Sequence, residues 1–478
     1  MFDDLRSLVK KIDEMGKLKK VEGADWDLEI GTILELNTER NGPTLLFDKI
    51  RGYPEGYRII TYPLYSREAQ ILTFGFPEGL SDLEMVRYWQ EKSSKFVPQK
   101  MSEIRSGPVE ENVISGDAID ILKFPVPKWH EFDGGRYIGT GVCTITQDPD
   151  TGIINSGVYR VMVHDSKTLA FYVSPGKHAT IMREKYWNKG KDCPVVMSFG
   201  QDPLLFVMSG APLPWGLSEI DMVSYLKGKP FEVIKGKSTG LPIPATAEIV
   251  IEGFSPPPSV DSRPEGPFGE WTGYYASGSR NEPLVNIKTI YHRNDPILWG
   301  NPPLKPPIST AGFPIPVMTS ASVWEALERC RIPGIKGVWI HGPANRVIIV
   351  VSIQQMYLGH AKQVATMAAT LFSGGACTGR YAIVVDDDID PTNWEEVTWA
   401  VCTRCDPATG IDIVTGLLTS PLDPMLSPEK REMKNYTTDK VVINACRPYH
   451  WIKDFPRVNR ASNDLRKKVF DKWKHLFE

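Results

Sequence analysis

Apolar positions follow different spacings along the chain. Over residues 5–15 they recur every three or four positions, which places them on one face of a helix, whereas residues 44–47 and 58–61 form short apolar runs typical of buried strands. Further helical spacing covers residues 28–36, 67–72 and 83–91. The first hundred residues therefore predict a small α/β domain.

The middle of the chain has the spacing of a β-rich domain. From about residue 105 to residue 310, short runs of β-branched and aromatic residues alternate with Gly and Pro turns, as in a barrel or a sandwich. The expected strands cover residues 139–146, 157–163, 169–173, 195–199, 247–252 and 284–291. Helical spacing interrupts them at residues 179–189 and 218–226.

Alternation of helix and strand returns in the last third. The expected helices cover residues 317–331, 359–371, 394–402 and 463–477, and the expected strands cover residues 337–340, 346–353 and 381–385. The sequence thus predicts a multidomain α/β (α+β) protein with domains over residues 1–105, 106–310 and 311–478.

Composition narrows the class of protein. Of the 478 residues, 41% are apolar and 24% are charged, and the net charge of −3 gives no reason to expect nucleic acid or an anionic membrane as a partner. No apolar run approaches the length of a membrane span, and the first residues lack the pattern of a secretory signal. Seven scattered cysteines, an odd number, favour a reducing compartment over a disulfide framework, so we expect a cytoplasmic protein.

The stretch Arg263–Glu270 carries the most unusual chemistry. It holds two carboxylates, Glu265 and Glu270, among two prolines and two glycines, and we expect a shaped loop that is neither helix nor regular strand. Carboxylates held close together differ in pKa, so that one serves as an acid and the other as a base or charge partner. Taken alone, a Glu-Gly-Pro stretch of this kind is better interpreted as a solvated turn whose acids point to water.

Side chains at four further positions could bind a ligand or take part in a reaction. Arg160, which follows Asn155 by five residues, could pair with a substrate carboxylate through its planar fork, and alternatively is a solvated side chain. His178 stands between Lys177 and a predicted helix, where an anion or only water could face it. Glu219 opens another predicted helix and alternatively only complements the helix dipole. Asn, His and Glu together suit Mn²⁺, although their separations are too long for a metal motif by themselves.

Other motifs give weaker evidence of function. Asp386–Asp390 contains DDxxD, but it follows a predicted strand and precedes Pro391 and a helix, so we interpret it as a corner with capping acids. Cys402 and Cys405 form a lone CxxC, which we interpret as two core or partly buried thiols. The chain has no glycine fingerprint of a dinucleotide fold, no P-loop and no Gly-x-Ser-x-Gly.

Taken together, the candidate residues resemble the motifs of one family. Asn155–Arg160, His178, Glu219 and Glu265–Glu270, in this order and spacing, are similar to the UbiD family of prenylated-FMN-dependent decarboxylases. The likeness continues in residues 245–253 and 399–407 and covers the whole chain. It implies an N-terminal α/β domain, a central split β-barrel that binds the flavin, and a C-terminal α/β oligomerisation domain.

The resemblance also implies a set of cofactors. Asn155, His178 and Glu219 would bind Mn²⁺, which bridges the protein to the phosphate of prenylated FMN, and K⁺ would bind near Ser209–Ala211. Some family members carry lysine and tyrosine where this chain has Gly374–Cys377, which leaves open the cation that helps to anchor the phosphate. The residues that would line the flavin are Val158, Tyr159, Arg160, Lys177 and His178.

The implied reaction is the reversible decarboxylation of an aromatic or heteroaromatic carboxylic acid, with CO₂ as the product. Glu270 would protonate the carbon after CO₂ leaves, which requires a raised pKa, and Arg160 would hold the carboxylate or keep Glu265 ionised. Trp271 would narrow the pocket and favour a planar substrate. Three tyrosines at positions 172, 274 and 275 have the same implication, or only pack in the core.

The resemblance implies partners as well. A UbiX-type flavin prenyltransferase would supply the cofactor, and the chain would form a homo-oligomer, a dimer or a hexamer. Two alternatives belong to other classes: an FMN-dependent split-barrel oxidoreductase that uses NAD(P)H, and a non-catalytic flavin-binding assembly protein. Neither has a chemical need for the Glu-Arg-Glu and Asn-His-Glu sets together.

Overall fold

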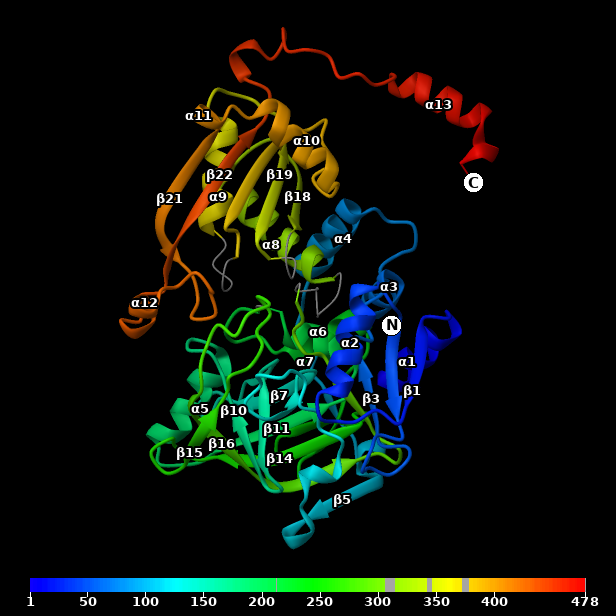
Figure 1. Ribbon diagram of the computed structural model, residues 1–478, viewed down its shortest axis with the longest axis vertical. Coiled ribbons are helices and arrows are strands. Elements are labelled where there is room, and N and C mark those ends of the chain that lie inside the picture. Colours follow the sequence, from blue (N-terminus) through cyan, green and yellow to red (C-terminus); the bar gives the residue numbers. More distant parts are fainter. Residues whose placement is uncertain (212, 306–313, 342–345, 372–377, 478) are drawn as a thin grey trace.

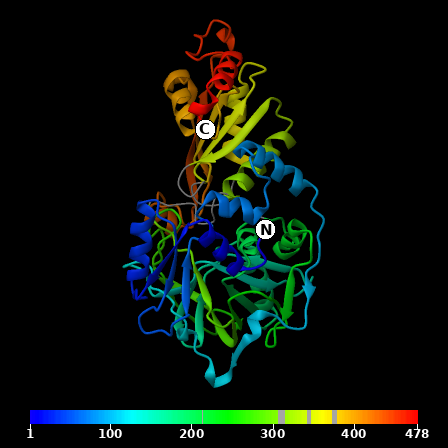
Figure 2. The ribbon, with the colours of Figure 1, turned by 90° about the vertical axis from the view of Figure 1, so that its right-hand side faces the viewer.

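The computed structural model describes residues 1–211, 213–305, 314–341, 346–371 and 378–477. The molecule is elongated, with the N-terminal and central elements in one part and the C-terminal sheet in another (Figures 1 and 2). We call residues 314–477 the C-terminal part, within the described ranges. No helix in the described ranges is long and apolar enough to cross a bilayer.

The N-terminal elements form a small sheet with helices, as the sequence predicts. The helices are α1 (Leu5–Glu14), α2 (Glu29–Glu39), α3 (Arg67–Phe74) and α4 (Asp82–Ser94). The sheet runs in the order β1 (Leu18–Glu22), β2 (Thr44–Asp48), β3 (Arg58–Thr61) and β17 (Ile297–Gly300). Helix α1 begins at a capping box between Asp4 and Ser7 and buries Leu5, Leu8 and Ile12. Strand β17, which no apolar pattern singled out, joins this sheet from far along the chain.

The central sheet, traced over the described residues, has ten strands. Its main path is β6-β9-β10-β16-β14-β11-β7-β8, with β5 and β15 also paired to β16. The strands are β5 (Asn112–Ser115), β6 (Arg136–Gly139), β7 (Val142–Gln147), β8 (Ile154–Gly157), β9 (Val161–Asp165), β10 (Thr168–Phe171), β11 (Cys193–Phe199), β14 (Ile249–Ser255), β15 (Ser262–Glu265) and β16 (Arg280–His292). The helices on this sheet are α5 (His178–Asn188), α6 (Pro203–Ser209) and α7 (Glu219–Lys227).

The single strand predicted over residues 157–163 is wrong. Strand β8 pairs with β7 at one end of the sheet path, whereas β9 pairs with β6 and β10 near the other end. The chain makes this transfer through residues 158–160 alone, and four chain steps span no more than about 14 Å. The two ends of the sheet therefore lie close together, and the sheet is curled into a half-barrel. Apolar spacing could not reveal this break, because residues on both sides of it are buried.

Smaller elements complete this part of the molecule. A short sheet runs in the order β13-β12-β4. Its strands are β4 (Ser102–Glu103), β12 (Glu232–Lys235) and β13 (Pro242–Pro244). The domain boundaries predicted after residues 105 and 310 stay predictions.

The C-terminal part contains a sheet in the order β18-β19-β20-β22-β21. Its strands are β18 (Ile335–His341), β19 (Ile348–Ile353), β20 (Tyr381–Asp386), β21 (Ile411–Leu418) and β22 (Thr437–Ala445). The helices are α8 (Pro314–Arg329), α9 (His360–Leu371), α10 (Trp394–Arg404), α11 (Pro407–Gly410), α12 (Pro428–Glu432) and α13 (Asn463–Lys472). The sequence prediction missed β21 and β22, whose polar and partly exposed residues lack a clean apolar alternation. Helix α13 buries none of its residues and extends away from this sheet (Figure 1).

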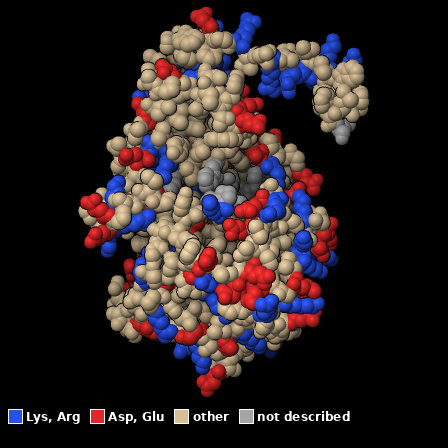
Figure 3. Space-filling view, viewed as in Figure 1, with Lys and Arg blue, Asp and Glu red and all other residues tan. Residues whose placement is uncertain are grey.

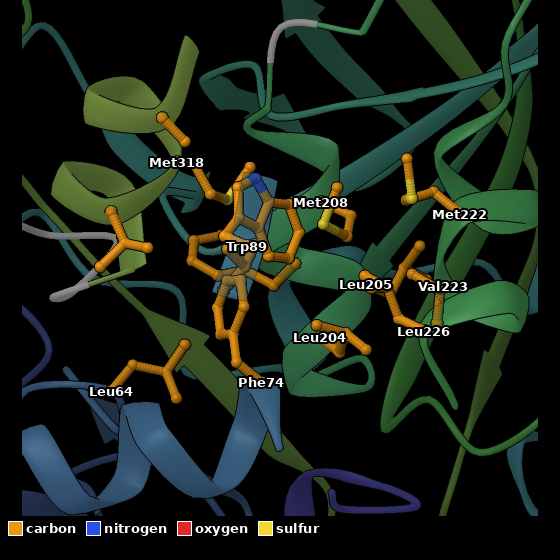
Figure 4. Close-up of a cluster of buried hydrophobic side chains, with 14 of the residues drawn as sticks. Leu64, Phe74, Trp89, Leu204, Leu205, Met208, Met222, Val223, Leu226 and Met318 are labelled. Atoms are coloured by element: carbon orange, nitrogen blue, oxygen red, sulfur yellow. The ribbon is translucent and has the colours of Figure 1, made fainter. Parts of the chain in front are cut away.

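One apolar cluster joins the parts of the molecule. Figure 4 shows Phe74 of α3, Trp89 of α4, Leu204 of α6, Val223 of α7 and Met318 of α8 around a common interior, and all of them are buried. Burial of such side chains is worth roughly 1.5–3 kcal/mol each. The cluster thus fixes α7, which carries Glu219, against elements on either side of it.

Candidate active site

The break between β8 and β9 positions Arg160. Because the chain leaves one strand and joins another within three residues, Arg160 lies at the edge of the curled sheet rather than within a strand. Glu265 is the last residue of β15, where it pairs with Arg280 of β16. The expectation that Arg263–Glu270 contains no regular strand is therefore wrong for its first three residues. The loop begins at Gly266, whose φ of 86° suits glycine.

Arg160 contacts both carboxylates of this stretch. Its Nε and Nη2 donate to Oε1 and Oε2 of Glu265 over 2.9 and 2.7 Å, a bidentate pair, and its Nη1 donates to Oε1 of Glu270. The side chains of Arg160, Glu265 and Glu270 are 6, 0 and 9% exposed. The structure thus brings together three of the predicted site residues in a buried ion-pair network.

This network has an unequal distribution of charge. Burial raises the pKa of Glu270 to about 7; the positive charge of Arg160 opposes this rise and the negative charge of Glu265 adds to it. Burial by itself would lower the pKa of Arg160, but Glu270 and Glu265 outweigh burial and raise it. Glu270 can therefore exchange a proton near neutral pH, while Arg160 keeps its charge.

Aromatic rings enclose the Arg160 guanidinium. Its central carbon lies 4.5 Å from the ring centroid of Tyr172 and 5.4 Å from that of Phe268. The guanidinium of Arg280 lies 4.4 Å from the same Tyr172 ring. These contacts restrict Arg160 to the orientation that reaches both carboxylates.

Two buried groups that sequence reasoning missed hold the loop after β15. Tyr137 of β6 donates to Oε1 of Glu265 over 2.9 Å. The carboxylate of Asp133 accepts from the backbone N–H of Gly269 over 3.2 Å and from the Tyr275 hydroxyl over 3.3 Å. The only signal for these residues is the Asp133-Gly134-Gly135 turn, which indicates a close approach of backbones without naming the partner.

That close approach is present at Gly134. Its N–H donates to the carbonyl of Pro267 over 2.8 Å, and a Cβ added to it would lie 2.1 Å from the carbonyl oxygen of Gly266. Any side chain at this position would displace the loop that carries Glu270.

The predicted metal ligands lie on three elements that contact one another. Asn155 is in β8, His178 begins α5 and Glu219 begins α7, and β8 contacts both helices. Glu219 accepts from the backbone N–H of Ser156 over 2.7 Å. Within the described ranges, no hydrogen bond or ion pair joins His178 to Asn155 or Glu219. The ring of His178 instead meets Trp215 edge-on at 5.0 Å.

The chemistry of these residues fits a divalent cation. Glu219 is 3% exposed without a cationic partner among the described residues, and burial raises its pKa to about 7. The side-chain amide nitrogen of Asn155 is buried without a hydrogen-bond partner, and amide N and O positions are interchangeable by a flip. A cation would satisfy both groups. No cluster of three His, Cys, Asp or Glu side chains suited to a metal occurs in the described ranges, so a cation held by His178 and Glu219 would need the Asn155 amide as well.

The remaining predicted residues have ordinary surroundings. Val158 and Tyr159 are partly buried beside the two large apolar clusters. Ser209 contacts the hydroxyl of Ser156 over 2.6 Å, which places the predicted K⁺ segment next to β8. The segment Gly374–Cys377 lies outside the described residues.

The acidic segment after β20 is structural. Arg404 of α10, itself 1% exposed, contacts Asp386 over 2.9 Å and Asp388 over 2.7 Å. The predicted corner is confirmed, but its acids do not cap α10. The cap is Asn393, whose side-chain oxygen accepts hydrogen bonds from the backbone N–H groups of Glu395 and Glu396. Cys405 is partly buried as predicted, whereas Cys402 is exposed.

Three family models match the chain, one after another along its length. Models of the N-terminal, Rift-related and C-terminal domains of 3-octaprenyl-4-hydroxybenzoate carboxy-lyase match residues 9–89, 100–306 and 314–445. Over 98% of its length the chain is 32% identical to pyrrole-2-carboxylic acid decarboxylase of Pseudomonas aeruginosa, of which the match covers 97%. The chain belongs to the UbiD family. The resemblance in the motifs is confirmed.

Solved UbiD-class structures have the same three-domain architecture. The enzyme HmfF of Pelotomaculum thermopropionicum in complex with FMN matches with a TM-score of 0.83 at 27% identity, over 97% of this chain and 98% of HmfF. An evolved dimeric form of HmfF with prenylated FMN matches with a TM-score of 0.80 at 26% identity, over 97 and 98%. The predicted mixed α/β fold is confirmed. UbiD-type decarboxylases are carboxy-lyases, so the family speaks against the NAD(P)H oxidoreductase and the non-catalytic protein.

Proposed function

We propose that this UbiD-family chain decarboxylates an aromatic or heteroaromatic carboxylic acid reversibly with prenylated FMN, and that Glu270 is the proton donor. The observation that carries the proposal is the buried contact of Arg160 with both Glu265 and Glu270, in which burial raises the pKa of Glu270 to about 7. A relative that acts on pyrrole-2-carboxylic acid supports a heteroaromatic substrate.

Asn155, His178 and Glu219 would hold Mn²⁺, and through it the phosphate of the flavin, beside Val158, Tyr159 and Lys177. Prenylated FMN, when bound, supplies the electron sink that loss of CO₂ from an aromatic carbon requires. The UbiD-class relative HmfF binds FMN, and its evolved form binds prenylated FMN. The proposal includes K⁺ near Ser209–Ala211, a UbiX-type prenyltransferase as maturation partner, a homo-oligomer and a cytoplasmic location. The evolved dimeric form of HmfF supports the homo-oligomer.

The proton has a defined place on Glu270. Oε1 accepts from Arg160, which can only donate, so the proton of the neutral carboxyl resides on Oε2. After CO₂ leaves, Oε2 gives this proton to the ring carbon, and the new carboxylate is stabilised by the adjacent guanidinium. In the carboxylating direction Oε2 removes the ring proton. Arg160, held by Glu265, keeps the acid oriented in both directions.

The proposal is tested on protein co-expressed with a flavin prenyltransferase. We expect an intact cofactor mass above FMN by one cyclised isoprenoid unit, Mn in the same sample, and CO₂ release from pyrrole-2-carboxylic acid or a related aromatic acid. Glu270→Gln should retain the flavin and lose activity by a factor of roughly 10²–10⁴. Glu325→Gln on α8, at the surface, is the matched control. Full activity of Glu270→Gln would exclude it as the acid, and unmodified FMN that NAD(P)H reduces would favour an oxidoreductase.

A further inference from the structure

Asp133 contacts the turn of the candidate acid at both of its ends. Its Oδ1 accepts from the backbone N–H of Gly269, directly before Glu270, over 3.2 Å, and from the hydroxyl of Tyr275 over 3.3 Å. Between these two points the backbone N–H of Glu270 donates to the carbonyl of Tyr274 over 3.0 Å, which closes the turn. One oxygen atom thus holds both ends of the turn that carries the acid.

The other oxygen of Asp133 faces His130. Oδ2 accepts from the backbone N–H of His130 over 3.1 Å, and Nδ1 of the His130 ring lies 3.3 Å from it. Because a carboxylate can only accept, this geometry places the ring hydrogen on Nδ1. The side chain of Asp133 is fully buried. Donors of its own segment therefore occupy one oxygen, and donors of the turn occupy the other.

The segment that contains Asp133 also contacts the rest of the acid stretch. The backbone N–H of Gly134 donates to the carbonyl of Pro267 over 2.8 Å. The hydroxyl of Tyr137 donates to Oε1 of Glu265 over 2.9 Å. Tyr137 thus holds the first carboxylate of the stretch, and Asp133 holds the turn of the second. Different side chains make the two contacts, so each contact can be removed without the other.

The turn lies next to solvent. Tyr274 and Tyr275 are 63 and 38% exposed, whereas Glu270 between them and Gly269 is buried. The ring centroid of Trp271 lies 5.0 Å from the guanidinium carbon of Arg346, so the turn meets the C-terminal part. The molecule is hollowed between the C-terminal part and the part below it (Figure 3). A turn in this place needs a fixed support on the central sheet to keep its acid buried.

We propose that Asp133 is a positioning residue for the decarboxylation, whose carboxylate holds the turn so that Glu270 stays buried against Arg160. The inference rests on the proposed function. An amide could not replace this carboxylate. Each oxygen of Asp133 faces a backbone N–H, one of His130 and one of Gly269, and a backbone N–H can only donate. In either orientation, the NH₂ group of an asparagine would face one of these donors.

The protonation of Glu270 reports its position. Burial is the largest cause of its raised pKa, which is about 7, and the other groups that act on this pKa are Arg160, Glu265 and Arg280. Asp133→Asn changes none of these three charged groups. Because burial outweighs the opposing charge of Arg160, the pKa of Glu270 should fall towards its ordinary value when the turn loosens and Glu270 meets water.

The test compares matched variants of the full-length, flavin-loaded chain. Asp133→Asn should lower kcat for pyrrole-2-carboxylic acid by roughly tenfold or more, and leave KM within about twofold and the flavin content unchanged. Infrared difference spectra follow the carboxyl band of Glu270, which its loss in Glu270→Gln assigns. In Asp133→Asn this band should titrate about one pH unit or more below the midpoint of the unmodified chain.

Asp423→Asn is the control for the loss of a buried carboxylate. Asp423 lies in the C-terminal part, is fully buried and also accepts from a backbone N–H, that of Met425 over 3.0 Å. Its substitution should change neither kcat nor the midpoint of Glu270.

Two results would overturn the inference. One is a kcat of Asp133→Asn close to that of the unmodified chain. The other is a lower kcat with an unchanged titration of Glu270. If Asp133→Asn does not fold by circular dichroism, Tyr275→Phe makes the test, because it removes one of the two contacts with the turn and leaves Asp133 in place. A lower midpoint of Glu270 is then expected, and an unchanged midpoint would overturn the inference.

Failure of the proposed function gives a different result. If the unmodified chain releases no CO₂ from any acid tested, the decarboxylase is refuted, and the infrared titration still decides whether Asp133 holds Glu270. If the chain is active but Glu270 titrates identically with and without the Asp133 carboxylate, only the positioning role is refuted.

Discussion

The hydroxyl of Tyr137 lies 2.9 Å from Oε1 of Glu265, the oxygen that also accepts from Nε of Arg160. Glu265 therefore accepts three hydrogen bonds within the network, whereas the side chain of Glu270 accepts one among the described residues, from Arg160. Hydrogen bonds to a carboxylate favour its charged form. This difference in donors is the structural reason to assign the proton to Glu270.

Tyr137→Phe should therefore slow the reaction without removing the cofactor. Loss of one hydrogen bond to a buried carboxylate costs about 1–2 kcal/mol, equivalent to a decrease of roughly tenfold in kcat. Steady-state decarboxylation and flavin content measure the effect. Tyr65→Phe, which removes an exposed hydroxyl 3.4 Å from Asn41, is the control. Unchanged kcat in Tyr137→Phe would show that Arg160 alone suffices to hold Glu265.

The rate of CO₂ release should fall as pH rises through 7. Glu270 must be protonated to act as the donor, and burial raises its pKa to about 7, so its protonated fraction falls about tenfold per pH unit above that value. Its folded-state pKa exceeds the unfolded value, so ionisation of Glu270 also lowers stability as pH rises between its ordinary value and about 7. A kcat profile from pH 5.5 to 9 checks the first effect. Residual activity of Glu270→Gln should not follow this profile.

Glu219→Ala should remove the metal. The variant loses the one carboxylate among the candidate ligands, and we expect a fall of at least tenfold in bound Mn, measured by elemental analysis, together with weaker flavin retention. Asp221→Ala, two residues along the same helix, is the control, because its carboxylate pairs with Lys100 over 2.8 Å instead. Equal Mn content in the unmodified and Glu219→Ala chains would refute the ligand assignment.

Arg404→Leu should affect stability rather than chemistry. It leaves Asp386, 2% exposed, with Arg447 as its one cationic partner among the described residues, and breaking a buried pair costs about 3–5 kcal/mol. Urea denaturation measures the loss, and Arg329→Leu in an exposed pair should cost about 1 kcal/mol or less. Activity per folded molecule should stay unchanged, and added Mg²⁺ should have no effect. A variant of full stability that responds to Mg²⁺ would instead assign a metal to the acidic segment.

Local patterns predicted most elements but not their arrangement. Apolar spacing predicts helix α1, and an unbroken apolar run predicts β19. The split between β8 and β9 has no local signal, because it depends on which neighbours each half pairs with. The same holds for β17, which joins β3 across most of the N-terminal and central sequence.

The candidate site was predictable as a set of residues, not as a geometry. Glu265 and Glu270 stand out by composition, but Arg160 lies 105 residues before Glu265, and only the curled sheet brings them together. Tyr137 and Asp133 went unnoticed because a buried tyrosine and a turn aspartate are common outside active sites. Their roles follow from contacts that no single stretch of sequence contains.

Gly134 has a consequence for how this enzyme could change over generations. A Cβ added at Gly134 would lie 2.1 Å from the carbonyl oxygen of Gly266, so a methyl group has no room there. Substitution of Gly134 would therefore displace Glu270, the candidate acid, even though Glu270 itself is unchanged. In a library selected for new substrates, position 134 should remain glycine among survivors as consistently as position 270 remains glutamate, although glycine at 134 performs no chemistry.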